Sequence, residues 1–113
     1  MADLRATASP LAVAAGLRAS QEALASRLRQ AAVARFDSMK VDWAGIMLLK
    51  GEAADEAFGI IAGDVEGQVE WWRETLRQQG HEPDQVERLV GEYRRAAMRN
   101  LRERLRTGMD NGP

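Results

Sequence analysis

The stretch that decides the fold is FGIIAGDVEGQVEWW, residues 58–72, because it combines a helical pattern of apolar residues with regularly spaced glycines. At about 100° per residue, apolar side chains fall on one stripe of a helix from residue 54 to residue 76. The members of this stripe are Ala54, Phe58, Ile61, Val65, Val69, Trp72 and Leu76. The glycines at 59, 63 and 67 fall on the opposite face, among glutamates. The stripe predicts a helix, and the glycines decide whether that helix is continuous.

Three glycines inside a helix, on a face open to solvent, would together cost roughly 2–3 kcal/mol relative to alanine. A helix break at Gly63 and Asp64 avoids this cost, with Gly63 in a left-handed turn and Asp64 capping a second helix. A continuous helix with a partner packed closely on the glycines also avoids it, and a strand–turn arrangement is the third possibility. We favour the break, because Asp64 and Glu66 would then place negative charge at a helix N-terminus.

A long amphipathic helix is predicted before this stretch, over about residues 10–36. Ser9 is a favourable N-cap, and Pro10 is tolerated at the first helical position. The apolar residues that share a narrow sector of this helix are Leu17, Leu24, Leu28 and Ala31. We expect residues 1–8 to form a short disordered tail.

A second long helix is predicted near the C-terminus, over about residues 84–107. Gly80 ends the preceding helix, and Pro83 or Asp84 begins the new one. Its apolar stripe consists of Val86, Val90, Tyr93, Ala97, Leu101 and Leu105. We expect Gly108 to cap the C-terminal end of this helix, and residues 109–113 to form a disordered tail.

The segment DSMKVDWAGIMLLKG, residues 37–51, contains a short apolar run that periodicity alone cannot assign. We favour a short buried helix, with Ser38 as its cap and Lys50 and Gly51 as its stop. The alternative is an α+β fold with a short β-hairpin at about residues 44–62. The sequence therefore predicts a single all-α domain over residues 1–113, a small bundle of four to five helices with long first and last helices.

The charges are unevenly distributed in a chain whose formal net charge is −1. Residues 88–106 contain seven arginines and two glutamates, whereas residues 52–74 contain seven acids and one arginine. We expect these two segments to pair, either within one chain or between two chains. The basic segment also presents a ridge opposite its apolar stripe, formed by Arg88, Arg95, Arg99, Arg102 and Arg106. We call this set the arginine ridge.

The sequence carries no pattern typical of a reaction or a cofactor. The absence of cysteine excludes disulfides and thiolate chemistry. His81, the only histidine, lies in a polar turn without the spacing of a metal-ligand motif. The glycines lack the Lys-Ser/Thr of a phosphate-binding loop. We therefore expect no enzymatic activity, no metal and no cofactor.

Composition also bears on where such a chain is made and found. No apolar run is long enough for a signal sequence or a membrane span, so we expect a cytoplasmic protein. The basic residues are almost all arginine, and alanine is abundant, which is typical of a GC-rich bacterial or phage genome.

The function that we expect is protein–protein interaction, by a small regulator, adaptor or assembly factor that acts through helix faces and forms a homodimer. Trp71 and Trp72 are adjacent, so one helix cannot bury both in the same direction. Trp71 falls on a flank with Ile60, and exposed aromatic residues often anchor interfaces. The candidate contact residues are Trp71, Ile60 and Trp43. The alternative is a nucleic-acid-binding accessory protein that contacts phosphates through Arg95, Arg99, Arg102 and Arg106.

Overall fold

The structure, a computed structural model, describes residues 10–110, including the side chains of residues 18–108. Within these residues there are four helices and no strand, in the order α1 (Pro10–Met39), α2 (Trp43–Met47), α3 (Glu52–Gln78) and α4 (Pro83–Asp110). The predicted all-α fold is therefore confirmed, and the alternative β-hairpin at about residues 44–62 is wrong. The predicted cap at Ser9 and the predicted tail at residues 1–8 lie outside the described residues.

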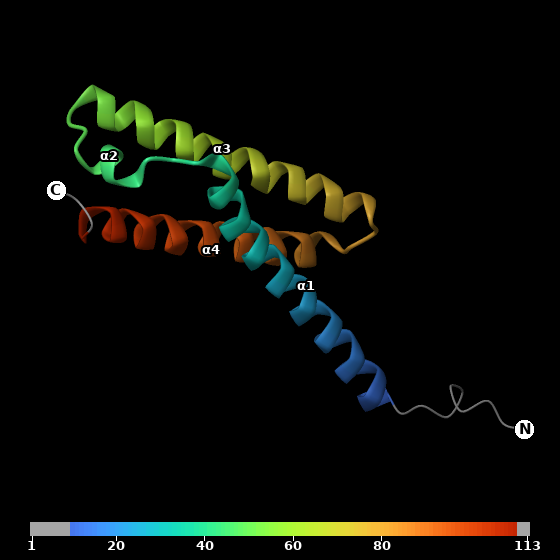
Figure 1. Ribbon diagram of the computed structural model, residues 1–113. Coiled ribbons are helices and arrows are strands. Elements are labelled where there is room, and N and C mark those ends of the chain that lie inside the picture. Colours follow the sequence, from blue (N-terminus) through green and yellow to red (C-terminus); the bar gives the residue numbers. More distant parts are fainter. Residues whose placement is uncertain (1–9, 111–113) are drawn as a thin grey trace, which may run out of the picture.

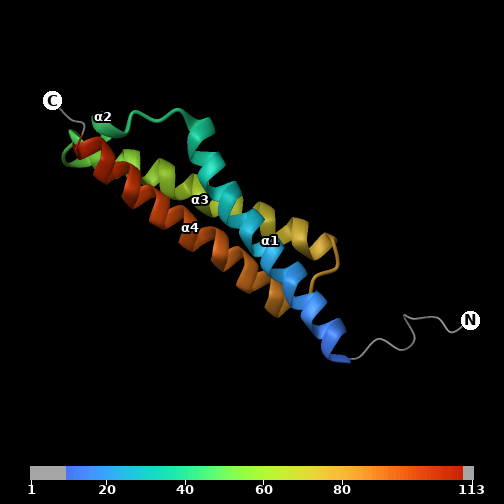
Figure 2. The ribbon, with the colours of Figure 1, turned by 60° about the horizontal axis from the view of Figure 1, so that its bottom comes forward.

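The arrangement follows from one central helix, α4, which contacts each of the other three. Helices α3 and α4 run antiparallel, and α1 crosses them at an angle (Figure 1). The first turns of α1 extend beyond the pair formed by α3 and α4, as Figures 1 and 2 both show. None of the helices in residues 10–110 has the length and apolar character that crossing a membrane requires.

The core is formed where the apolar stripes of α1, α3 and α4 meet. The largest fully buried side chains are Leu28 and Phe36 of α1, Val69 and Leu76 of α3, and Val86, Leu89, Val90 and Tyr93 of α4. Helix α1 ends three residues later than predicted, where Lys40 adopts a φ of 53°. The stripes predicted for α3 and α4 identify most of their buried residues, although Phe58 is 37% exposed. For α1 the prediction is correct only at Leu28, because Leu24 and Ala31 are partly buried and Phe36 was not included.

Helix α2 is short, as predicted, but it is not buried. Its cap is Asp42, whose carboxylate accepts a hydrogen bond from the Gly45 backbone N–H at 2.9 Å. The predicted cap, Ser38, instead donates its hydroxyl to the carbonyl of Arg35 within α1. The helix ends at Met47, so the last residues of the apolar run lie beyond it and are exposed. The prediction of a buried helix was therefore wrong, because the run extends across the end of the helix.

Helix α3 is continuous through its glycines, so the predicted break at Gly63 was wrong. Among the described glycines, only Gly51 and Gly80 have a positive φ. The stripe on the inner face explains the continuity, because Ile61, Val65, Val69 and Leu76 are all buried. A fully buried side chain of this size contributes about 1.5–3 kcal/mol. Four such residues outweigh the roughly 2–3 kcal/mol that three helix-interior glycines cost.

The turn before α4 has the predicted form, whereas the C-terminal end of α4 does not. Gly80 has a φ of 88° and closes α3, and α4 begins at Pro83. Gly108, the predicted cap, lies inside α4, which continues to Asp110. A β-carbon at Gly108 would lie 3.0 Å from the backbone of both Trp43 and Ala44. Glycine is therefore needed here because α2 packs directly against the backbone of α4.

Candidate interaction surfaces

The side of α3 that faces away from the core carries exposed apolar residues. Ile60 is 64% exposed and Trp71 is 56% exposed. They lie eleven residues apart, which places them within about 20° of each other around the helix. Gly63 and Gly67 lie between them, and a β-carbon at either glycine would meet no atom within 4 Å. We call these four residues the outer face of α3.

The two adjacent tryptophans are placed differently, as the sequence predicts. Trp72 packs against the core, and its ring lies 6.5 Å from that of Tyr93. Trp71 stands edge-on to Trp72, with ring centroids 4.9 Å apart and an angle of 83° between the planes. The contact with Trp72 therefore orients the exposed ring of Trp71 without burying it.

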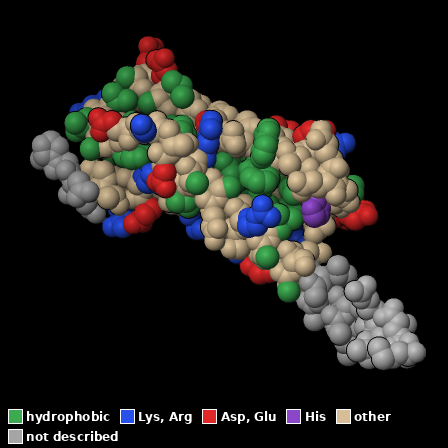
Figure 3. All heavy atoms as spheres, turned by 45° about the vertical axis from the view of Figure 1, so that its right-hand side comes forward, with side chains coloured by type: hydrophobic (Ala, Val, Ile, Leu, Met, Phe, Trp, Pro, Cys, Tyr) green, Lys and Arg blue, Asp and Glu red, His purple; other side chains and the backbone are tan. Residues whose placement is uncertain are grey.

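Acidic side chains accompany the outer face of α3. Glu56, Glu70 and Glu74 share the side of α3 opposite the buried stripe. Glu70 accepts a hydrogen bond from Arg73, and Glu74 lies 3.7 Å from a guanidinium nitrogen of Arg77. Over its whole length, α3 contains seven acidic residues and only two arginines. Along the upper edge of the molecule in Figure 3, where α3 lies, acidic side chains are visible at the surface.

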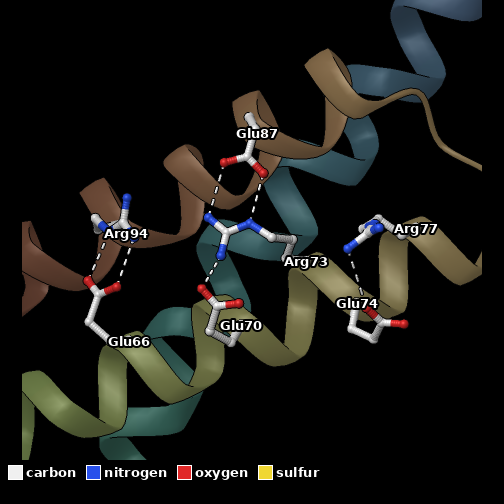
Figure 4. Close-up of polar contacts among 7 residues, drawn as sticks. All are labelled: Glu66, Glu70, Arg73, Glu74, Arg77, Glu87 and Arg94. Carbon is white, nitrogen blue, oxygen red and sulfur yellow. Dashed lines mark hydrogen bonds and ion pairs between the residues drawn. The ribbon is translucent and has the colours of Figure 1, made fainter.

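Two bidentate ion pairs connect α3 to α4 (Figure 4). Arg94 donates to both carboxylate oxygens of Glu66, at 3.0 and 2.8 Å. Arg73 donates to both oxygens of Glu87, at 2.8 and 3.0 Å. These hydrogen bonds lower the pKa of Glu66 and of Glu87 below its ordinary value. The Arg94–Glu66 pair joins the acidic and basic segments within one chain, and the two pairs together fix the register of α3 against α4.

A third connection joins α1 to α3. The guanidinium of Arg35 donates to both oxygens of Asp64, at 3.1 and 2.6 Å. The hydrogen bond with Asp64 raises the pKa of Arg35. Asp64 was expected to cap a helix, and in the structure it instead holds α1 beside α3.

Trp43, the third predicted contact residue, belongs to the scaffold. Its ring packs edge-on against Phe36, with centroids 5.7 Å apart. The guanidinium of Arg104 lies 5.8 Å from the centroid of each of these rings and also pairs with Asp37. Trp43 is only partly exposed, so we do not include it in the interaction surface.

A second apolar surface lies where α2 joins α3, and the sequence analysis missed it. We call its residues, Met47, Leu48 and Leu49, the α2–α3 junction. Leu48 is 66% exposed, and its two neighbours are also exposed. The only signal in the sequence was the apolar run itself, which was interpreted as a buried segment.

The arginine ridge is only partly neutralised. Arg95 pairs with Glu92 at 3.2 Å, and Arg106 pairs with Glu103. Among the described residues, Arg99 and Arg102 have no hydrogen bond or ion pair. The residues that line a shallow hollow of about 340 Å³ at this place are Arg94, Arg95, Met98, Arg99 and Arg102. The ridge is therefore a basic surface with free guanidinium groups at its centre.

The part of the chain that the structure describes contains no group of three or more side chains that could hold a metal ion. His81 lies in the turn before α4, and its ring Nδ1 is 3.4 Å from the side-chain oxygen of Gln85, which lies in the first turn of α4. Comparisons of the chain with protein-family models, curated proteins and solved structures found no match. The function must therefore be inferred from these three surfaces themselves.

Proposed function

We propose that this protein is a non-enzymatic interaction module, a small regulator, adaptor or assembly factor, that binds a protein partner through the outer face of α3. The observation that carries the proposal is the exposure of Ile60 and Trp71 on the same side of one helix. Single exposed apolar residues are normal on protein surfaces. Two large ones that bracket an open strip of backbone form a surface of the kind that interfaces use.

The geometry of α3 supports this proposal over a purely structural role. The stripe on the inner face already supplies the buried contacts of α3, and Trp72 rather than Trp71 packs against the core. The fold therefore does not require large apolar side chains at positions 60 and 71. A partner that covers them would remove both from water, which contributes about 25 cal/mol for each Å² of apolar surface.

The second candidate function is nucleic-acid binding through the arginine ridge. The observation that favours it is that Arg99 and Arg102 have no partner among the described side chains and line one hollow. Arginines of this kind bind phosphates and release counterions, so that affinity falls steeply with salt. Arg95 and Arg106 would contribute less, because Glu92 and Glu103 partly neutralise them.

Self-association as a homodimer is a separate prediction. It is disfavoured through the outer face of α3, because the acids beside that face would meet their own copies. The α2–α3 junction is the better surface for a second copy, because its residues include no acid and the next residue in the chain, Lys50, is basic. Sedimentation velocity of the wild-type protein and of Leu48→Ser tests this prediction.

Affinity capture from the cells that make the protein tests the proposed function. We would compare the wild-type bait with Ile60→Ser/Trp71→Ala and with Arg99→Gln/Arg102→Gln, each before and after nuclease treatment. The proposal predicts a protein partner that survives nuclease, is lost with the first variant and is kept by the second. Partners that disappear on nuclease treatment, and that depend only on the arginines, would establish the nucleic-acid function instead.

A further inference from the structure

The charge around the outer face of α3 restricts the chemistry of its partner. Seven acids and two arginines lie on this helix; Arg73 is shared between Glu70 and Glu87 of α4, and Arg77 lies 3.7 Å from Glu74. Asp64 is neutralised by Arg35. Glu56, by contrast, has no hydrogen bond or ion pair among the described side chains and lies one turn before Ile60. The rim of the apolar face is therefore acidic, and a partner that covers it must supply positive charge.

The shape of the face restricts the form of the partner. Ile60 and Trp71 lie three turns apart, about 16 Å along the helix axis at about 1.5 Å per residue. The surface between them is low and open, because neither Gly63 nor Gly67 has a neighbouring atom where a β-carbon would lie. A second helix can therefore approach the backbone of α3 closely between its two apolar ends.

We infer that the outer face of α3 binds a basic amphipathic helix of another protein. The apolar side chains of that helix cover Ile60 and Trp71, and its lysines or arginines lie against Glu56 and Glu74. Because Ile60 and Trp71 are three turns apart, the partner carries apolar residues at positions i, i+4, i+7 and i+11. This inference rests on the proposed function and adds the identity of the partner's contact element.

A second copy of this chain fits the face less well. In an antiparallel pair of α3 helices, related by a two-fold axis, Glu56 of one copy would approach Glu74 of the other. Like charges brought together at an interface oppose binding. Beside the chain's own basic surface, at Arg99 and Arg102, the large exposed apolar side chains among the described residues are Met98 of α4 and Val33 of α1. They belong to two different helices, so they do not form two apolar contacts three turns apart on one helix.

The test uses two synthetic helical peptides of about 20 residues, with leucines at the four positions named above. One peptide has lysines beside the leucines, and its twin has glutamates. Binding is followed by tryptophan fluorescence, and the complex by calorimetry, at about 50 mM and about 500 mM salt. We expect the lysine peptide to bind at least about tenfold more tightly than its twin, and to weaken about tenfold or more at the higher salt concentration.

Variants of the full chain show whether the peptide uses this face. Ile60→Ser/Trp71→Ala is expected to weaken binding of the lysine peptide by about tenfold or more. Gly67→Gln places a side chain on the open strip, leaves every acid in place and is expected to weaken binding similarly. The matched control, Arg99→Gln/Arg102→Gln, changes the far surface and is expected to leave affinity within about twofold.

Each other outcome contradicts the inference in a distinguishable way. If the glutamate peptide binds as tightly as the lysine peptide or more tightly, and the Ile60→Ser/Trp71→Ala variant loses this binding, the partner helix is not basic. The proposed docking function of the outer face would then still hold. Binding of the lysine peptide that neither variant on α3 weakens would show attraction to acids elsewhere and overturn the inference. If neither peptide binds and the protein forms a dimer that requires Trp71, the face belongs to a second copy.

Discussion

The inner and outer faces of α3 differ in what their apolar residues do: those on the inner face pack in the core, and those on the outer face are exposed to solvent. Val69 and Leu76 on the inner face are fully buried, whereas Ile60 and Trp71 on the outer face are more than half exposed. All four belong to the same continuous helix. Their angular position relative to α4 decides whether they stabilise the fold. Hydrophobic side chains on the outer face are therefore available for a partner.

The largest expected difference between the two faces is in stability. Leu76→Ala removes a fully buried side chain and is expected to lower the free energy of unfolding by about 2–5 kcal/mol. Its counterpart on the outer face, Ile60→Ala, is expected to change that free energy by less than about 0.5 kcal/mol. Urea unfolding followed by circular dichroism measures both. Equal losses would mean that the outer face is packed against the protein.

The next largest expected effect on stability is at Gly108, which lies where α2 contacts α4. A β-carbon at this position would meet the backbone of Trp43 and Ala44 at 3.0 Å. Gly108→Ala is therefore expected to displace α2 and to destabilise by about 1–3 kcal/mol. The fluorescence of Trp43 should change as α2 moves, in a background with Trp71 and Trp72 replaced by phenylalanine. Unchanged stability and fluorescence would show that α2 does not pack on this glycine.

Gly63 on the outer face is expected to respond with the opposite sign. Its backbone is helical and a β-carbon would meet nothing within 4 Å, so Gly63→Ala should stabilise by about 1 kcal/mol. Thermal and urea unfolding of this variant measure the sign. A loss of about 1 kcal/mol would instead indicate a left-handed turn and a broken helix at this position.

A smaller effect concerns the ion pairs that hold α3 against α4. The pKa values of Glu66 and Glu87 are lowered from the ordinary value of 4.5 by their arginine partners. The folded protein then binds fewer protons than the unfolded chain, so these pairs stabilise it fully above that value. Their contribution is lost as the pH falls through the lowered values of the folded state.

Unfolding measured between neutral and acidic pH tests these pairs. Arg73→Gln/Arg94→Gln should unfold with a weaker dependence on pH in the acidic range than the wild-type protein. Glu56→Gln, which removes an acid without an ion pair among the described residues, serves as the control and should keep the wild-type dependence. Identical profiles for all three proteins would show that the bidentate pairs have no energetic role.

Much of this fold is predictable from the sequence, because the apolar stripes of the long helices specify which faces are buried. The stop at Gly80 and the start at Pro83 are local signals, and both were identified correctly. The break at Gly63 was predicted by weighing the cost of the glycines alone. Burial of four side chains on the other face outweighs that cost and depends on α4, which no local pattern contains.

The remaining errors have the same origin. Gly108 resembles a helix cap in the sequence, and only the close approach of α2 explains why it is glycine. The apolar run from Ile46 to Leu49 was assigned to the core, and the end of α2 at Met47 leaves Leu48 and Leu49 exposed instead. For the candidate site, adjacency to Trp72 and the shared flank with Ile60 were enough to single out Trp71. The packing of Trp43 between α1 and α4 required the structure.

The central claim is that the outer face of α3 is reserved for a partner and is not needed for folding. The most direct test is the free energy of unfolding of the double variant Ile60→Ser/Trp71→Ala in urea. We predict a loss of no more than about 1.5 kcal/mol, most of it from the contact between Trp71 and Trp72. A loss of about 3 kcal/mol or more would show that these side chains stabilise the fold, and it would remove the reason to expect a partner there.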